Sequence, residues 1–184
     1  HAAIGFAMTD LDGAYIETNA AFCTLTGYSA EELKSLSIRQ LIHPDDLAEN
    51  MRQVERLKSG EISDFVIENR YLHKSGATIW VRKSISAAAD AQGRRSWIIA
   101  LVEDISQRKQ AEQEINKGRA VLEASLASMS DSVFICDNAG QVLLYNDAFV
   151  KYHRFASREE CAKSLEGYTP ILDVYSVEIG RAHV

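Results

Sequence analysis

The 184-residue sequence predicts an α+β fold in which a five-stranded antiparallel sheet carries short helices on one face. Two short strands and several capped helices come first, and three long stretches with alternating apolar and polar residues follow, which is the period of strands. The opening construction also occurs twice, because "DGAYIETNAAF" ends at Phe22 and "AGQVLLYNDAF" ends at Phe149. This repeat aligns Asn19 with Asn146, 127 residues apart, and predicts a second, incomplete copy of the same domain.

The first elements form a hairpin followed by two short helices. "IGFAMTD" and "AYIET" are predicted strands, and the turn "DLDG" between them uses Gly13 for its positive φ. Asn19 is expected to cap the helix "AAFCTLT", which ends at Gly27. Ser29 and the Glu three residues later form a capping-box pattern at the start of the next helix. In the second copy Asn146 and Ser157 are the corresponding helix caps.

A longer helix is expected from Pro44, since proline suits the first helical position and the two aspartates after it favour the positive end of the helix dipole. Its apolar residues recur at helical spacing up to Gly60. His43 is better explained as a residue preceding this helix than as a ligand. The strands that follow are "ISDFVIENRYLH", "ATIWVRKSISAAA" and "RSWIIALVEDIS", joined by the turns "KSG" and "DAQG".

With these elements in place the chain resembles a PAS domain with its C-terminal PAC portion. The resemblance rests on "NAAF", "TGYSAEEL", "HPDD", "HKSGATIWV" and "EDISQRK". It covers about residues 4–104, and it continues over about residues 122–175 for the early part of a second copy. We therefore expect a PAS domain with its PAC portion over residues 1–105, a helical signalling linker over 106–129, and the N-terminal part of a second PAS domain over 130–178. The last residues, 179–184, read "IGRAHV" and are interpreted as a non-native tail.

The linker has apolar residues at coiled-coil spacing, namely Ile115, Leu122, Leu126 and Met129. Gly118 and two charged residues interrupt this seam, so a helix that only packs on its own domains explains the pattern as well as a dimeric coil does. The resemblance favours the coil, because PAS proteins commonly pass signals through such helices between paired subunits. A homodimer through the linker helix and PAS surfaces is therefore expected, with Leu122 and Leu126 at the interface.

Composition limits the function further. The net charge of −6 with dispersed basic residues argues against nucleic acid as a partner, and no apolar run is long enough for membrane contact within this segment. Three scattered cysteines suggest neither disulfides nor zinc and fit a reducing cytoplasm. The five histidines form no triad or metal pattern with their neighbours, so no catalytic residue and no metal site are assigned.

A PAS fold holds small molecules between its sheet and its helices, which makes several apolar residues candidates for lining a pocket. The alternative is that they are simply core. The resemblance disfavours flavin, since the Asn-Cys-Arg setting is absent, and haem, since no histidine lies on the long helix; the ligand stays unknown. Asp104 and Ser106 resemble the family segment that couples the sheet to the outgoing helix. The pocket candidates are Phe6, Met8, Phe22, Phe65, Ile67, Trp80 and Trp97.

The resemblance implies a sensory input and dimerisation module of a bacterial signal-transduction protein, and we favour a sensor histidine kinase. The alternatives are a PAS module of a diguanylate cyclase or phosphodiesterase, and a ligand-free protein-interaction scaffold. Sequence beyond Glu178 would discriminate them, because a kinase has a phosphoacceptor helix and an ATP site, whereas a cyclase has a Gly-Gly-Asp/Glu-Glu-Phe stretch.

Overall fold

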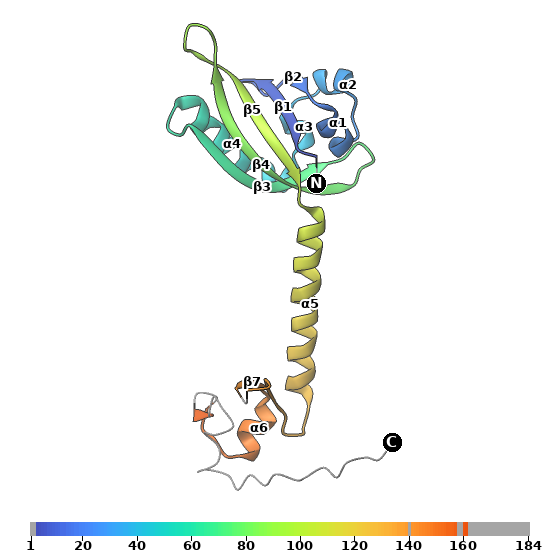
Figure 1. The fold of residues 1–184 in the computed structure, drawn as a ribbon, viewed down its shortest axis with the longest axis vertical. Helices are drawn as coiled ribbons and strands as arrows, with labels where there is room; N and C mark the ends of the chain where they lie inside the picture. Colours follow the sequence, from blue (N-terminus) through green and yellow to red (C-terminus); the bar gives the residue numbers. More distant parts are fainter. Residues whose placement is uncertain (1–2, 140, 158–159, 162–184) are drawn as a thin grey trace. The chain divides into compact units, whose positions relative to one another are not determined.

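The computed structural model describes residues 3–139, 141–157 and 160–161, and the chain divides into two compact units, His1–Gln113 and Glu114–Val184 (Figure 1). The part of the expected second copy after residue 161, and the expected tail over residues 179–184, lie outside the described residues. Each unit is described by itself below.

The first unit contains the predicted five-stranded antiparallel sheet, with strands in the order β2-β1-β5-β4-β3. The strand β5 lies between β1 and β4, with Ala7 opposite Ala100, so the two ends of the unit share one sheet as the sequence predicted. This arrangement confirms the α+β class and the hairpin order. The strands are β1 (Gly5–Asp10), β2 (Tyr15–Thr18), β3 (Asp64–Leu72), β4 (Thr78–Ala89) and β5 (Arg95–Asp104).

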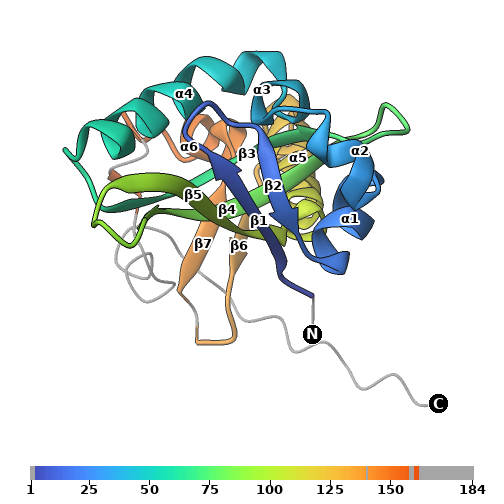
Figure 2. The same ribbon diagram turned by 90° about the horizontal axis from the view of Figure 1, so that it is seen from above.

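Four helices cover one face of this sheet (Figure 2). The side chain of Asn19 accepts a hydrogen bond from the first turn of the first helix, and Ser29 opens the second with the expected capping box, which confirms both predicted caps. The longest of these four helices ends at Gly60 (φ 87°), also as predicted. The third helix was not expected, although the side chain of Gln40 accepts from the N–H of Ser37 at 2.8 Å, a capping signal that the sequence carries. The helices are α1 (Ala20–Thr26), α2 (Ala30–Lys34), α3 (Ile38–Leu41) and α4 (Pro44–Ser59).

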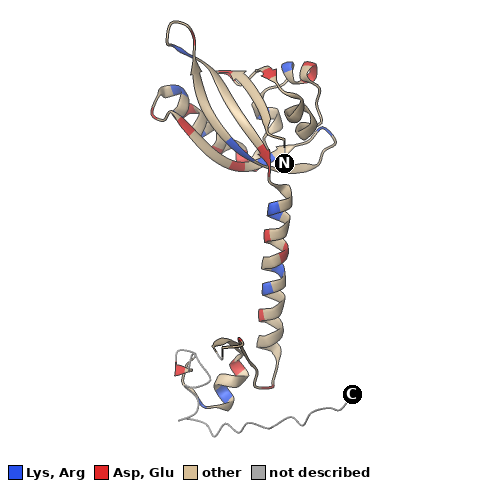
Figure 3. Cartoon of the chain, in the orientation of Figure 1, with Lys and Arg blue, Asp and Glu red and all other residues tan. Residues whose placement is uncertain are grey.

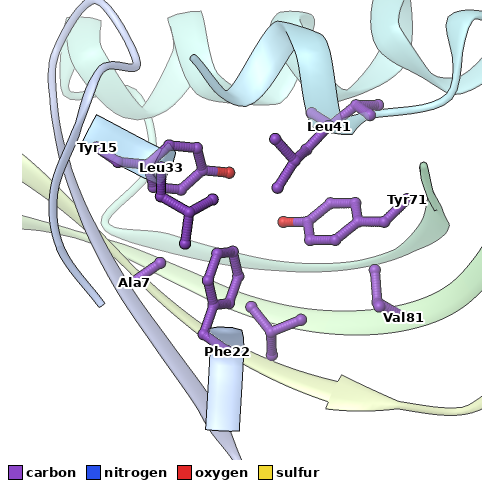
Figure 4. Close-up of a cluster of buried hydrophobic side chains, with 9 residues drawn as sticks. Ala7, Tyr15, Phe22, Leu33, Leu41, Tyr71 and Val81 are labelled. Atoms are coloured by element: carbon purple, nitrogen blue, oxygen red, sulfur yellow. The ribbon is translucent and has the colours of Figure 1, made fainter. Parts of the chain in front are cut away.

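The core of the first unit lies between the helices and the sheet. Phe22 is completely buried and its ring contacts the rings of Tyr15 and Tyr71, at centroid distances of 5.7 and 6.3 Å (Figure 4). A second cluster joins Val54 and Leu57 of α4 to the sheet. Burying a side chain as large as phenylalanine contributes about 1.5–3 kcal/mol, so this layer fixes how the helices sit on the sheet.

The helix α5 (Ser106–Ser128) follows β5 directly, and its bounds agree with the predicted linker helix. The second unit then forms the hairpin of β6 (Phe134–Cys136) and β7 (Val142–Tyr145), followed by α6 (Asp147–Tyr152). Asn146 caps α6 as predicted. The cap expected at Ser157 lies at the edge of the described residues, where the carboxylate of Glu160 accepts from the N–H of Ala156 at 2.7 Å.

The repeated asparagine makes the same hydrogen bonds in both copies. The Oδ1 of Asn19 accepts from the N–H groups of Phe6 and Phe22, each at 2.9 Å. The Oδ1 of Asn146 accepts from Val133 at 3.0 Å and from Phe149 at 2.9 Å, which are the residues 127 positions later. The repeat in the sequence is therefore a repeat of one hydrogen-bonded construction, in which a single amide holds the first strand to the helix.

Charged residues of both signs are spread over the first unit and along α5 (Figure 3). On α5, Arg119 pairs with Glu123 one turn later at 2.8 Å. Within the described residues, none of the helices has the length and apolarity that crossing a bilayer requires.

Candidate functional site

A cavity of about 30 Å³ lies between the sheet and helices α3 and α4 of the first unit. Most of its wall is aliphatic, and a few polar side chains enter it from the strands and from α4. This volume is enough for about two water molecules. The cavity is lined by Ala7, Thr9, Tyr15, Ile38, Ile42, Asn50, Val54, Tyr71, Lys83, Ile85, Ile98 and Ala100.

Lys83 is the most unusual residue of this wall, because only 2% of its surface is exposed. It lies between Val81 and Ile85 on the buried face of β4, so its side chain points toward the helices. Its Nζ donates to the Oδ1 of Asn50 on α4 at 2.6 Å. Among the described residues no carboxylate lies within 4.0 Å of this nitrogen. A lysine is therefore buried with an amide, and not an ion pair, as its partner.

Burial lowers the pKa of Lys83 from its ordinary value of 10.5 to about 7, and the negative charge of Asp46 opposes this only in part. Asp46 is itself engaged, since its carboxylate accepts from the guanidinium of Arg70 at 2.7 and 2.9 Å. The ring of Tyr71 lies 5.0 Å from the Lys83 nitrogen, where its π face favours a cation. The surroundings of Lys83 thus stabilise its positive charge only weakly, and its pKa lies near neutral pH.

Two hydroxyls that line the cavity have no hydrogen-bond partner among the residues that the structure describes. These are the Oγ1 of Thr9 and the OH of Tyr15, and both are buried. Figure 4 shows the hydroxyls of Tyr15 and Tyr71 pointing toward one another from opposite sides of the core. Burial raises the pKa of both tyrosines, so each stays a neutral hydroxyl that is able to donate. Buried polar groups are nearly always paired, so unpaired hydroxyls beside a cavity point to an occupant.

None of the seven residues predicted to line a pocket lines this cavity. Phe22, Phe65 and Ile67 do lie on the helix side of the sheet, but they pack into the two core clusters. The other four lie on the opposite face, because the strand register pairs them with outward-pointing neighbours, and this corrects the expectation that they face the helices. They are Phe6, Met8, Trp80 and Trp97.

The sequence did carry a signal for Lys83. In "WVRKSIS" the residues Val81 and Ile85 mark the buried face of the strand by their alternation, and Lys83 stands between them at the same phase. A lysine at an inward-facing strand position is rare, because its charge is costly to bury. The prediction used aromatic and large apolar residues as markers of a pocket, and Lys83 is neither.

The exit from the sheet to α5 is held by the two residues expected to couple them. The N–H of Ser106 donates to the carboxylate of Asp104 at 2.8 Å. The Ser106 hydroxyl accepts from the N–H of Trp80 at 3.1 Å, and the N–H of Ile105 donates to the carbonyl of Trp80 at 2.9 Å. The first turn of α5 is therefore bound directly to strand β4, which also carries Lys83.

A salt-bridge cluster on the outer face of the sheet adds to this junction. Glu68 of β3 pairs with Arg108 at 2.6 Å and with Lys109 at 2.8 Å, both in the first turn of α5. Hydrogen bonds from these two cations hold the pKa of the Glu68 carboxyl below its usual range. The Lys109 nitrogen also lies 5.1 Å from the ring of Trp80. Both β3 and β4 are thus bound to the first turn of α5.

Along α5 the residues of the expected seam differ in exposure. Ile115 and Leu122 are 71% and 49% exposed, and Met129 just after the helix is 47% exposed. Leu126 is only 6% exposed, and its carbonyl accepts from the Nδ2 of Asn146 at 3.2 Å. The burial of Leu126 is therefore already supplied within one chain, which leaves Ile115, Leu122 and Met129 as the exposed apolar residues of the seam.

Each described histidine contacts neighbouring residues of the fold. The Nδ1 of His43 accepts from the N–H of Asp45 at the start of α4, which confirms its position before that helix. His73 contacts the hydroxyl of Ser75 at 2.8 Å, and His153 stacks against Phe149 with ring centroids 4.4 Å apart. Over the part of the chain that the structure describes, no group of three His, Cys, Asp or Glu side chains is placed to hold a metal ion.

Comparison with known proteins identifies relatives of the first unit. A model of the PAS fold matches residues 15–102. The probable diguanylate cyclase DgcE of Escherichia coli K12 is 39% identical over 113 residues, which are 61% of this chain and 10% of that protein. The sensor histidine kinase TmoS of Ectopseudomonas mendocina is 28% identical over 142 residues, which are 77% of this chain and 14% of that protein. The chain thus spans less than a fifth of the length of these curated relatives.

Two solved structures show the same fold. The PAS domain of a protein from Colwellia psychrerythraea aligns with a TM-score of 0.53 at 24% identity, over 56% of this chain and 87% of that one. A sensory box histidine kinase/response regulator from Burkholderia thailandensis aligns with a TM-score of 0.54 at 22% identity, over 67% of this chain and 92% of that one.

Proposed function

Since the first unit of this chain is a PAS domain, a sensory domain of signal-transduction proteins, we propose that the chain is the sensory input and dimerisation segment of a sensor histidine kinase. The single observation that carries the proposal is the junction at α5. The strand that bears Lys83 also binds Ser106, and Glu68 on the neighbouring strand binds the first turn of the helix. A ligand that moves these strands changes the contacts that start the helix.

We favour a kinase because the similarity to one kinase relative extends beyond the first unit. The likeness to the sensor histidine kinase TmoS covers 142 residues, more than the first unit contains, so it includes residues beyond it. The alternative, an input domain of a diguanylate cyclase, is favoured by the higher identity of 39% to DgcE over 113 residues. A ligand-free scaffold is disfavoured by the unpaired hydroxyls in the cavity wall.

Dimerisation is proposed to use α5. Ile115 and Leu122 lie seven residues apart and are exposed, so they follow the repeat of a coiled-coil seam. A second copy of this chain would cover both. The three free cysteines fit a reducing compartment, so the segment is proposed to act in the cytoplasm.

The test is a pair of chimaeras in which residues 1–128 precede either the phosphoacceptor and catalytic domains of a histidine kinase or a diguanylate cyclase domain. We expect Glu68→Gln to change autophosphorylation of the kinase chimaera, because it removes the anion that binds the first turn of α5. Glu61→Gln is the matched control, since Glu61 pairs at 2.7 Å with Arg56, away from α5. Equal output from the wild type and the Glu68 variant contradicts the input role, and a response confined to the cyclase chimaera favours the alternative.

A further inference from the structure

Three polar side chains form a buried cluster where α4 packs on the sheet. Lys83 of β4, Asn69 of β3 and Asn50 of α4 are all almost completely buried. The Oδ1 of Asn50 accepts from the Nζ of Lys83 at 2.6 Å and from the Nδ2 of Asn69 at 3.0 Å. Because both bonds end on one oxygen, the lysine nitrogen and the Asn69 amide are neighbours. The cluster thus joins one helix and two strands through a single acceptor.

The Asn69 amide uses only one of its two ends. Its Oδ1 is buried and has no donor among the residues that the structure describes. Asn69 lies opposite Val81, two residues from Lys83 on the same strand face, and such diagonal neighbours are within reach of a long side chain. Half a turn of the amide about its last torsion would place this oxygen where the nitrogen now lies. It would then accept from Lys83 and give up the bond to Asn50, so only a strong donor favours the turn.

The proton on Lys83 decides how strong that donor is. A neutral amine has two N–H groups and a lone pair, and the bond to Asn50 already occupies one of these N–H groups. An ammonium has three N–H groups and no lone pair, and burying it is costly unless further acceptors meet it. Charge-assisted hydrogen bonds are also roughly twice as strong as neutral ones. Burial lowers the pKa of Lys83 to about 7, so both forms are populated near neutral pH.

The other titratable groups that face this lysine keep one charge state in that range. Tyr15 of β2 and Tyr71 of β3 line the same cavity, and burial raises the pKa of both, so they stay neutral. Asp46 of α4 stays ionised, because hydrogen bonds hold the pKa of its carboxyl below its usual value. The residues that β1, β5 and α3 contribute to the cavity wall are uncharged. His43, just before α4, acts on Asp46 and does not line the cavity, so it is the group that a control must exclude.

Strand β3 connects the cluster to the start of α5. Asn69 faces the helices, and the residue before it, Glu68, is on the opposite face and pairs with Arg108 and Lys109 of α5. The bond from Asn69 to Asn50 ties this same part of β3 to α4. A turn of the Asn69 amide therefore changes how α4 holds the strand segment that carries the ion pairs to α5.

We propose that the first unit takes a proton as its signal, with Lys83 as the group that binds it and Asn69 as the side chain that changes partner. In the neutral form Asn69 donates to Asn50, and in the charged form its oxygen accepts from Lys83. The proton enters on the lysine lone pair, and no other bond is made or broken covalently. This assignment rests on the proposed sensory function and names pH as the signal of that domain.

The first experiment is NMR spectroscopy of the full chain, with the lysine side-chain nitrogens and the asparagine side-chain amides observed between about pH 5.5 and pH 8.5. We expect the nitrogen of Lys83 to titrate with a midpoint near pH 7. The amide signals of Asn69 should change with the same midpoint. A lysine that keeps one protonation state over this range, or an Asn69 amide that does not follow it, overturns the proposal.

Two variants move the midpoint in opposite directions. Asn50→Asp keeps the shape of the side chain and supplies an anion, so it should raise the midpoint of Lys83 by about one to three pH units. Asn69→Leu removes the acceptor of the charged form and should lower it. Lys34→Met is the control, because Lys34 is exposed and pairs with Glu31 at 2.7 Å. An unchanged midpoint in both asparagine variants contradicts the assignment, and because they lie on different elements, one poorly folded variant still leaves the other as a test.

The kinase chimaera tests whether this proton controls output. Autophosphorylation is measured for the wild type and for Lys83→Met at each pH, and their ratio removes the pH dependence of the kinase domain, which is the same in both. The ratio should change with the midpoint that NMR gives for Lys83. His43→Asn keeps a capping side chain and removes the other residue type that titrates in this range, so it should respond as the wild type does. A constant ratio, or a response lost in His43→Asn and kept in Lys83→Met, overturns the proposal.

Failure of this assignment is distinguishable from failure of the sensory role. The Glu68→Gln chimaera at fixed pH tests the sensory role alone, and the NMR titration tests the proton site alone. If Lys83 does not titrate but the Glu68 variant changes output, only the identity of the signal is wrong. If Lys83 and Asn69 titrate together and the Glu68 variant is without effect, the proton site is confirmed and the coupling to output is wrong.

Discussion

Replacement of Lys83 by methionine should change how the stability of the first unit depends on pH. Methionine has a similar length and no charge, so it keeps most of the packing and removes the cost of burying an ammonium. The pKa of Lys83 falls from 10.5 in the unfolded chain to about 7 in the folded one. At 1.36 kcal/mol for each pKa unit, the charged form costs the folded state about 5 kcal/mol at and below pH 7, as an upper limit.

The direction of this pH dependence follows from how many protons the folded and unfolded chains bind. Between about pH 7 and pH 10.5 the unfolded chain binds the lysine proton and the folded chain does not, so the free energy of unfolding rises with pH. From pH 7.5 to 9.5 this single group should add about 2.5 kcal/mol to the stability of the wild type. Tyr15 and Tyr71 act in the opposite direction only above about pH 10, where the unfolded chain loses their protons first. Measurements should therefore stop at pH 9.5.

The assay is urea unfolding followed by tryptophan fluorescence in buffers without carboxylates. Both tryptophans of the chain, Trp80 and Trp97, lie in the first unit, so the signal reports that unit alone. The Lys83→Met variant should be more stable than the wild type at pH 7, and the difference should shrink by about 3 kcal/mol by pH 9.5. A constant difference between the two proteins over this range refutes the burial of a titrating lysine.

Three further changes test other parts of the structure. Leu122→Glu should shift the chain from dimer to monomer in analytical ultracentrifugation, whereas Val121→Glu, on an equally exposed position outside the seam, should not; a dimer in both contradicts the seam. Gly27→Ala should lower the melting temperature more than Gly93→Ala, because both glycines have φ near 78° but only the new Cβ at Gly27 meets the ring of His73; equal losses argue against this contact. Asn19→Ala should cost about 2 kcal/mol in the same fluorescence assay, since it removes a helix cap and a strand contact, and a loss below about 0.5 kcal/mol would show that these bonds contribute little.

Local chemistry made most of the fold predictable. The caps at Asn19, Ser29 and Asn146 act on backbone groups three residues away, so the sequence shows them without knowledge of the tertiary structure. The long strands were equally visible through their period and turns. The pairing of β1 with β5 followed from the need of both ends to share one buried face.

The faces of the strands were less predictable, and the candidate site depended on them. In β1 the larger residues Phe6 and Met8 point away from the helices, and the smaller Ala7 and Thr9 line the cavity. Hydropathy predicts that Phe6 and Met8 face the core, because they are larger and more apolar than Ala7 and Thr9. Both faces of this strand contain apolar residues, so its alternation does not reveal which face is buried. The cavity exists because the small residues of β1 face it, whereas the sequence predicts a pocket lined by large aromatic residues. The partners of Lys83 come from strands and a helix far apart in sequence, which no local pattern reveals.

The asparagine that is repeated in both units recognises only main-chain atoms. The amide of Asn146 accepts from two peptide N–H groups and donates to the carbonyls of Leu126 and Asp131, so none of these bonds depends on what side chain the partner carries. These hydrogen bonds would form with any side chain at position 126, and the buried side chain of Leu126 adds packing to them. A joint made of main-chain atoms tolerates changes of side chain in the segments that it connects, so the same asparagine can close two copies whose sequences differ.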